Sequence, residues 1–124
     1  MSQWKEEELA AIAKDSSLYI SIPNADGSMH SPTRIWAAQA GDDLYCRGYA
    51  GTAARWYQSA KREGKGHISS GGIEKDVRFE FVDDKKTNDQ LDEGYRQKFA
   101  GSPYLEPMLS EQARQATVRL VPID

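Results

Sequence analysis

The residues best suited to bind a charged ligand lie between Leu44 and Ile68, in the run LYCRGYAGTAARWYQSAKREGKGHI. Five cations in this run face a single acid, Glu63, so its formal charge is +4 in a chain of net charge −3. The cations are Arg47, Arg55, Lys61, Arg62 and Lys65. A basic segment in an otherwise acidic chain is expected to attract an anion.

The order of elements in this run favours phosphate as that anion. It is predicted to form a strand, a turn through GYAG (Gly48–Gly51), and a helix over 53–63 that Thr52 or Gly51 caps. A helix start offers backbone amides to an anion, and guanidinium groups can grip phosphate with two hydrogen bonds. Arg55 falls in the first turn, where a cation opposes the helix dipole unless an anion is near. The alternative is that Trp56 is a core residue and that the arginines pair with the protein's own acids.

Other kinds of reactive site find less support. His30 and His67 are far apart and outside any cluster with metal-ligand spacing, so no metal is expected. The run from Ser69 to Gly72 lacks the nucleophile-elbow pattern, and Cys46 is expected to be a small buried residue. The acid pairs 42–43 and 83–84 fall at turns, where solvated carboxylates are typical. The sequence therefore names no catalytic side chain.

Composition predicts one globular domain over residues 1–124. The chain is 39% hydrophobic and 28% charged, which is typical of a folded domain. A pI near 5.4 argues against a nucleic-acid-binding protein. The N-terminus lacks an apolar stretch of signal-peptide type, and no segment is apolar for long enough to span a membrane. The single cysteine favours a reducing, cytoplasmic location.

Periodicity predicts six strands and flanking helices. Short loops between the early strands favour an antiparallel meander. The strands are expected at 18–22, 32–40, 44–49, 67–70, 76–83 and 117–121, with Val77, Phe79 and Phe81 inward. Helices are expected at 3–14, where Ser2 is the cap, and at 53–63. A capping box at Thr87–Gln90 is expected to begin a third helix, which carries Leu91, Tyr95 and Phe99 on one side. A single helical turn capped by Ser110 is expected at 111–114.

Two strand faces combine aromatic and basic residues. The strand at 44–49 presents Tyr45, Arg47 and Tyr49 together, a face suited to a ligand cleft or a subunit interface. The strand at 32–40 presents Arg34 and Trp36 together. Three aromatic side chains could cover the ring system of a ligand: Trp36, Tyr49 and Trp56.

Four runs of the sequence resemble a bacterial family known as domain of unknown function 2255. They are WKEEELAAIAKDSSLYIS, PTRIWAAQAGDDLYCRGYAGTAARWYQSA, VRFEFVDDKKTNDQLDEGYRQKF and ATVRLVP, and LYCRGYAGTAARWY is the most specific part. That family resembles the FMN-binding split barrels, which include pyridoxamine-phosphate oxidase and deazaflavin-dependent nitroreductases. The resemblance implies a mainly β fold with flanking helices, a six-stranded antiparallel split β-barrel, and a homodimer with any flavin at its interface.

The resemblance also implies a set of cofactor-binding residues. Tyr49, Gly51, Thr52 and Arg55 would lie near the phosphate of FMN or a deazaflavin coenzyme, with Arg47 and Arg34 on adjoining strands. With the aromatic side chains, the expected set is Arg34, Trp36, Arg47, Tyr49, Gly51, Thr52, Arg55 and Trp56.

Three functions are compatible with this set of residues. The first is a flavin- or deazaflavin-dependent reductase. The second is a non-catalytic binding or stress-related homodimer that uses the barrel as a scaffold, and the third is a carrier for another small anionic metabolite. The expected partners are such a ligand and a second copy of the chain, without nucleic acid or membrane.

Overall fold

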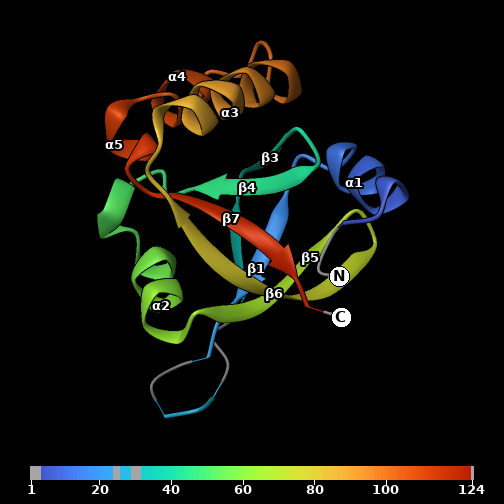
Figure 1. Ribbon diagram of the computed structural model, residues 1–124, viewed down its shortest axis with the longest axis vertical. Coiled ribbons are helices and arrows are strands. Elements are labelled where there is room, and N and C mark those ends of the chain that lie inside the picture. The colour runs from blue at the N-terminus through green and yellow to red at the C-terminus, as the bar shows by residue number, and fades with distance from the viewer. Residues whose placement is uncertain (1–3, 24–25, 29–31, 124) are drawn as a thin grey trace.

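The computed structural model describes residues 4–23, 26–28 and 32–123, and its strands form a single curled sheet (Figure 1). The strands are β1 (Leu18–Ser21), β2 (Thr33–Ile35), β3 (Ala37–Ala40), β4 (Asp43–Arg47), β5 (Lys65–Ser70), β6 (Ile73–Val82) and β7 (Thr117–Pro122). The α-helices are α1 (Glu6–Ala13), α2 (Arg55–Glu63), α3 (Lys85–Lys98), α4 (Leu105–Met108) and α5 (Glu111–Arg114), and the 3₁₀ turn η1 spans Gly51–Ala53.

The sheet is nearly closed into a barrel. Its strand order is β2-β1-β5-β6-β7-β4-β3, and all neighbouring pairs are antiparallel. The two edge strands, β2 and β3, are consecutive in the chain and only Trp36 separates them. The mainly β, antiparallel split-barrel prediction is therefore confirmed, but with seven strands instead of six.

The seventh strand comes from a bend at Trp36 within the strand predicted at 32–40. Before the bend, Ile35 pairs with Leu18 of β1. After it, Ala37 pairs with Cys46 of β4 on the other side of the barrel. The strand changes partner at one residue, and in this way it links the two edges of the sheet.

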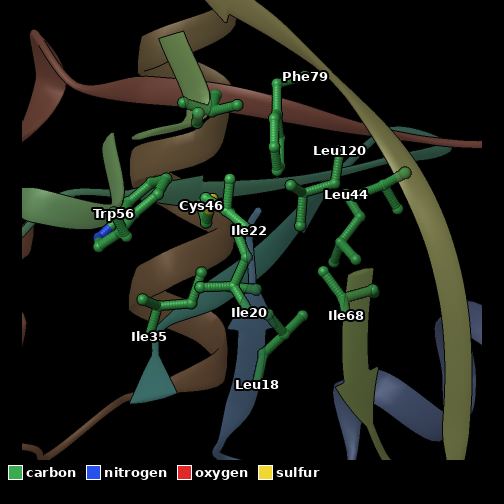
Figure 2. Packing of buried hydrophobic residues seen from close by; sticks show 14 of the residues in the cluster. Leu18, Ile20, Ile22, Ile35, Leu44, Cys46, Trp56, Ile68, Phe79 and Leu120 are labelled. Atoms are coloured by element: carbon green, nitrogen blue, oxygen red, sulfur yellow. The ribbon is translucent and has the colours of Figure 1, made fainter. Parts of the chain in front are cut away.

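The barrel interior is filled by apolar side chains that alternate along the strands. Figure 2 shows the labelled side chains pointing toward one another, with Trp56 of α2 at one end. The labelled cluster comprises Leu18, Ile20, Ile22, Ile35, Leu44, Cys46, Trp56, Ile68, Phe79 and Leu120. Phe81, predicted to face inward, is instead exposed and lies edge-on to Tyr57, with the Lys61 ammonium 5.1 Å from its ring centre.

A second apolar cluster lies outside the barrel, where α3 covers β3 and β4 (Figure 1). Leu91 and Tyr95 of α3 and Phe99, the residue that ends the helix, are buried here and pack with Ala38 and Tyr45. Their i, i+4, i+8 spacing places the three residues on one side, as predicted.

The helix starts differ in part from those predicted. Asp84 caps α3 by accepting a hydrogen bond from the Thr87 amide (2.8 Å), so the predicted capping box at Thr87 is wrong and the helix begins earlier. Ser110 caps α5 as predicted. The N-cap of α2 is Ala54, without a side-chain cap, in place of Thr52 or Gly51. The predicted cap Ser2 lies outside the described residues. No described helix is long and apolar enough to cross a bilayer.

Candidate functional site

An open groove of about 620 Å³ lies where three separate parts of the chain meet. The β2–β3 bend forms one wall, the end of β4 and the loop before α2 form the floor, and the segment around α4 forms the other wall. Its lining is Arg34, Ile35, Trp36, Arg47, Tyr49, Ala50, Ala54, Trp56, Tyr104 and Met108. Five of the eight predicted cofactor-binding residues therefore line one cavity, namely Arg34, Trp36, Arg47, Tyr49 and Trp56.

Aromatic side chains make up much of the groove wall. The Trp36 ring stacks on Phe99, with centroids 4.0 Å apart and planes 6° apart, and meets the edge of Tyr104 at 6.4 Å. Tyr49 and Tyr104 are 57% and 58% exposed, whereas Trp56 is buried against the barrel core. The groove thus has rigid aromatic surfaces inside and exposed phenol rings at its edges, an arrangement suited to a flat ring system.

The guanidinium of Arg47 is fully engaged inside the protein, which corrects the expectation that it grips an external anion. The residue is 1% exposed. A guanidinium has five N–H donors, and each has an acceptor here. Nε donates to Thr117 Oγ1 (3.1 Å), Nη1 to Asp92 Oδ1 (2.6 Å) and Met108 O (3.0 Å), and Nη2 to Asn88 O and Oδ1 (3.0 Å each).

The acid that neutralises Arg47 belongs to a larger ion network. Asp92 accepts from Arg47 with Oδ1 and from Arg114 with Oδ2 at 2.6 Å, and Arg114 also pairs with Asp89 at 3.0 Å. Asp92 and Asp89 come from α3, and Arg114 comes from α5. The network therefore fastens α3 and α5 to the barrel and leaves the groove floor with a compensated charge.

Helix α3 covers most of the strand face formed by Tyr45, Arg47 and Tyr49, which was expected to form a ligand cleft or a subunit interface. Tyr45 and Arg47 are buried beneath the helix, so neither offers an exposed side chain to a partner subunit, and of the two only Arg47 borders the groove, at its floor. The Arg47 guanidinium lies 5.3 Å from the centre of the Tyr95 ring of α3. Only Tyr49, beyond the end of β4, reaches the groove edge as an exposed side chain.

Gly51 and Thr52, two of the predicted phosphate contacts, lie outside the groove lining. Gly51 has φ = 67°, and a Cβ there would lie 2.6 Å from Gln112 Cγ and 2.8 Å from Gln112 O. This glycine is therefore explained by the close packing of η1 against α5. Thr52 is exposed, and its carbonyl accepts from Gln58 Nε2 at 3.4 Å.

Arg55, the third residue outside the lining, is exposed at the first position of α2. It borders a separate cavity of about 120 Å³, which Trp56 also lines. Trp56 is thus common to both cavities, and Arg55 lies beside the smaller one.

The side chains of Arg34 and Arg55 make no hydrogen bond or ion pair with any described residue. Arg34 acts on Asp15 only through space. The pKa of Asp15 is lowered first by hydrogen bonds from the Ser17 and Gly71 amides, and the charge of Arg34 adds a smaller effect. These two exposed arginines, unlike Arg47, are available to an external anion.

Several groove residues were not predicted from the sequence. Tyr104 and Met108 come from the segment around α4, which contains Pro103 and Pro107, and Ala50 and Ala54 have no side-chain chemistry to signal a site. The prolines mark an irregular exposed segment, which is a weak signal of a binding wall. Asp92 gave no signal, because its partner Arg47 is 45 residues away.

The other chemistries considered from the sequence stay unsupported. In the described part of the chain no group of three metal-ligating side chains could hold an ion. His67 is bonded to Asp76 (2.9 Å) and Glu74 (3.2 Å), and His30 lies outside the described residues. Cys46 is wholly buried, and burial raises the pKa of its thiol, so it is a packing residue as expected.

One family model matches most of the chain. The family described as "Uncharacterized protein conserved in bacteria (DUF2255)" matches residues 8–120. No curated protein matches the chain.

Solved structures with low sequence identity share the fold. The conserved hypothetical protein Rv2991 of Mycobacterium tuberculosis is 12% identical, with a TM-score of 0.70 over 98% of this chain and 81% of that one. A candidate pyridoxamine 5′-phosphate oxidase of Listeria innocua is 13% identical, with a TM-score of 0.64 over 95% and 90%. A protein named F420 reductase is 14% identical, with a TM-score of 0.56 over 98% and 97%.

Proposed function

Because the chain belongs to this bacterial family, and its split barrel is similar to that of proteins named as an oxidase and a reductase, we propose that it binds FMN or a deazaflavin coenzyme in the groove and acts as an oxidoreductase. The observation that carries the proposal is the open, aromatic-walled groove of about 620 Å³. When bound, such a cofactor would supply the hydride chemistry. The chain's own residues would hold the ring system and limit its contact with water.

The ring system is proposed to lie against Trp36 and Trp56. Trp36 is held flat against Phe99, so it offers a fixed surface, and Trp56 is fixed by the barrel core. A rigid wall binds a planar ligand at lower entropic cost than a mobile one. Tyr49 and Tyr104, exposed at the edges, would close over the ligand.

The phosphate is proposed to lie at the rim, between Arg34 and the start of α2. Arg47 has no donor left for it, whereas Arg34 lines the groove and is not ion-paired in the described residues. The α2 N-terminus has no side-chain cap, so its first amides can face an anion, and Arg55 adds a charge there. In this proposal Thr52 is a rim residue, and Gly51 shapes the turn without touching the ligand.

A homodimer would complete the proposed site. The two most exposed large aromatic side chains in the described residues, Tyr49 and Tyr104, lie on the edges of the same groove. Exposed aromatic side chains around an open cavity are typical of a surface that a partner covers. We propose that a second copy of the chain covers this edge.

A second candidate function is a non-catalytic carrier of a small anionic metabolite. The described groove lining holds no carboxylate, imidazole or thiol that could act as a general acid or base. This observation favours binding over side-chain chemistry, but a reductase that relies on its cofactor needs no such group.

The test compares FMN with riboflavin, which has the same ring system without the phosphate. Wild-type protein is expected to bind FMN, quench its fluorescence and melt at a higher temperature. Arg34→Gln is expected to weaken FMN binding about tenfold to a hundredfold, since a charged hydrogen bond contributes about 1.5–3 kcal/mol, and to leave riboflavin binding unchanged.

The matched control is Arg96→Gln, which removes an exposed arginine of α3 that pairs with Glu93 and does not line the groove. It should change neither affinity. If FMN, riboflavin and a deazaflavin coenzyme all fail to raise the melting temperature or change absorbance, the cofactor proposal is wrong. Saturable binding of another phosphorylated metabolite would then support the carrier.

A further inference from the structure

One wall of the groove is tied to α3 by a residue that does not touch the groove. Trp36 lies between β2 and β3, and the strand pairings stop at Ile35 and resume at Ala37. The hydroxyl of Tyr95 donates to the Trp36 carbonyl at 2.7 Å. Tyr95 is fully buried. The Tyr95 hydroxyl therefore fixes the backbone at the bend, because no strand pairing holds Trp36 in place there.

The side chain of Trp36 is fixed at the C-terminal end of the same helix. Phe99, which ends α3, lies four residues after Tyr95, so both rings are on one side. Phe99 stacks on Trp36 at 4.0 Å, and the Tyr95 and Phe99 rings are themselves 5.9 Å apart. The backbone and the ring of Trp36 are thus both positioned by α3.

The opposite wall is tied to the same helix through Arg47. Asp92 binds Arg47 at 2.6 Å, and Arg47 in turn donates to the carbonyl of Met108 at 3.0 Å. Met108 belongs to the wall that faces Trp36, and Asp92 does not line the groove. Asp92 and Tyr95 are three residues apart, so they lie on neighbouring turns of one helix face.

We propose that α3 is the template that sets the width of the groove, and that Tyr95 is the positioning residue for its aromatic wall. Asp92 acts through Arg47 on the other wall. Neither residue would touch the ligand. The effect on ligand affinity rests on the proposed function, whereas the effect on the Trp36 ring can be observed without any ligand.

The test variant is Tyr95→Phe, which removes only the hydroxyl and keeps the ring beside Phe99 and Arg47. FMN and riboflavin affinities are expected to fall by the same factor, about fivefold, since a neutral hydrogen bond contributes about 0.5–1.5 kcal/mol and both ligands carry the same ring system. Arg34→Gln, in contrast, should affect FMN alone. The matched control is Tyr57→Phe, a buried tyrosine that does not line the groove.

Ligand-free protein provides an independent measurement, the indole N–H resonance of each tryptophan in a ¹⁵N–¹H NMR spectrum. Tyr95→Phe is expected to shift the Trp36 resonance and to leave those of Trp4 and Trp56 in place. A lower melting temperature with unchanged FMN and riboflavin affinities would overturn the proposal. If the wild type binds neither ligand, the proposed function fails, and the Trp36 resonance alone decides whether Tyr95 positions the wall.

Discussion

The two faces of β4 are both buried, yet they are built in different ways. Leu44 and Cys46 point into the barrel among apolar side chains (Figure 2). Tyr45 and Arg47 point outward and are covered by α3. The inner face is buried by close packing of apolar side chains. On the outer face, the buried polar groups of Arg47 and Tyr45 are satisfied by hydrogen bonds. Burial on this strand therefore does not imply an apolar environment.

The difference matters because apolar packing and hydrogen bonding respond differently to mutation. When a buried apolar side chain is shortened, the loss of stability depends on the buried surface removed and on the volume of the cavity left behind. A buried charge whose partner is removed stays behind without solvent or counter-ion, which costs more than the pair itself contributes. The outer face also lies directly beneath the groove, so its hydrogen bonds connect stability to the proposed site.

Substitution of the outer-face arginine is expected to have the largest effect. Arg47→Met is expected to lower the free energy of unfolding by about 4 kcal/mol, because Asp92 keeps only its pair with Arg114 and the other buried acceptors of the guanidinium lose their donor. Urea denaturation measures the change. The control, Arg55→Met, removes an exposed arginine without a described partner and should cost less than about 0.5 kcal/mol. Similar losses for the two variants would contradict the distinction between a structural and an available arginine.

Shortening an inner-face side chain is expected to cost somewhat less. Leu44 is 2% exposed, and Leu44→Ala is expected to lower the free energy of unfolding by about 3 kcal/mol through lost burial and a residual cavity. Unlike Arg47→Met, it should leave the groove unchanged and preserve FMN affinity in the protein that remains folded. Ile123→Ala, at an exposed position, is the control and should be close to neutral. A Leu44 variant that loses FMN binding would show that the two faces are not independent.

The inner face was predictable from the sequence, whereas the outer face was not. Alternating apolar residues identified the strands, and apolar residues four apart identified the apolar side of α3, because the side-chain period follows directly from backbone geometry. The bend at Trp36 was missed because 32–40 reads as one continuous strand, and nothing local marks where pairing changes partner. The Arg47–Asp92 pair was missed because a contact across 45 residues leaves no local pattern.

Residue type located much of the candidate site, but it misassigned individual roles. Trp36 and Tyr49 were identified because aromatic side chains on a polar strand are unusual, and both line the groove. Gly51 was expected near the phosphate of a cofactor, but it lies outside the groove lining. The structure requires a glycine at this position because of the positive φ and the close contact with Gln112. In a sequence, a glycine required for this reason looks the same as a glycine that lies beside a phosphate.

A second charged cluster, exposed to solvent on β5 and β6, should have the smallest effect on stability. His67 is bonded to Asp76 and Glu74, and these hydrogen bonds, first that to Asp76, raise its pKa above the ordinary value of 6.5. Because the pKa is raised in the folded state, its stabilisation is full below about pH 6.5 and is lost as pH rises through the folded-state pKa. The carboxylates are mostly exposed, so the contribution should be a few tenths of a kcal/mol, within the range of about 0–1 for surface pairs.

His67→Gln tests that expectation through the difference in melting temperature between variant and wild type at pH 6 and pH 8.5. The difference should be present at pH 6 and shrink at pH 8.5, because neutral imidazole no longer attracts the two carboxylates. Lys98, whose pKa burial lowers to about 8, titrates in both proteins, so the comparison cancels its effect. A difference that grows with pH would mean that His67 stabilises the fold in its neutral form. If His67→Gln destabilised the protein as much as Arg47→Met does, solvent exposure would not explain the difference between the His67 cluster and the Arg47 network.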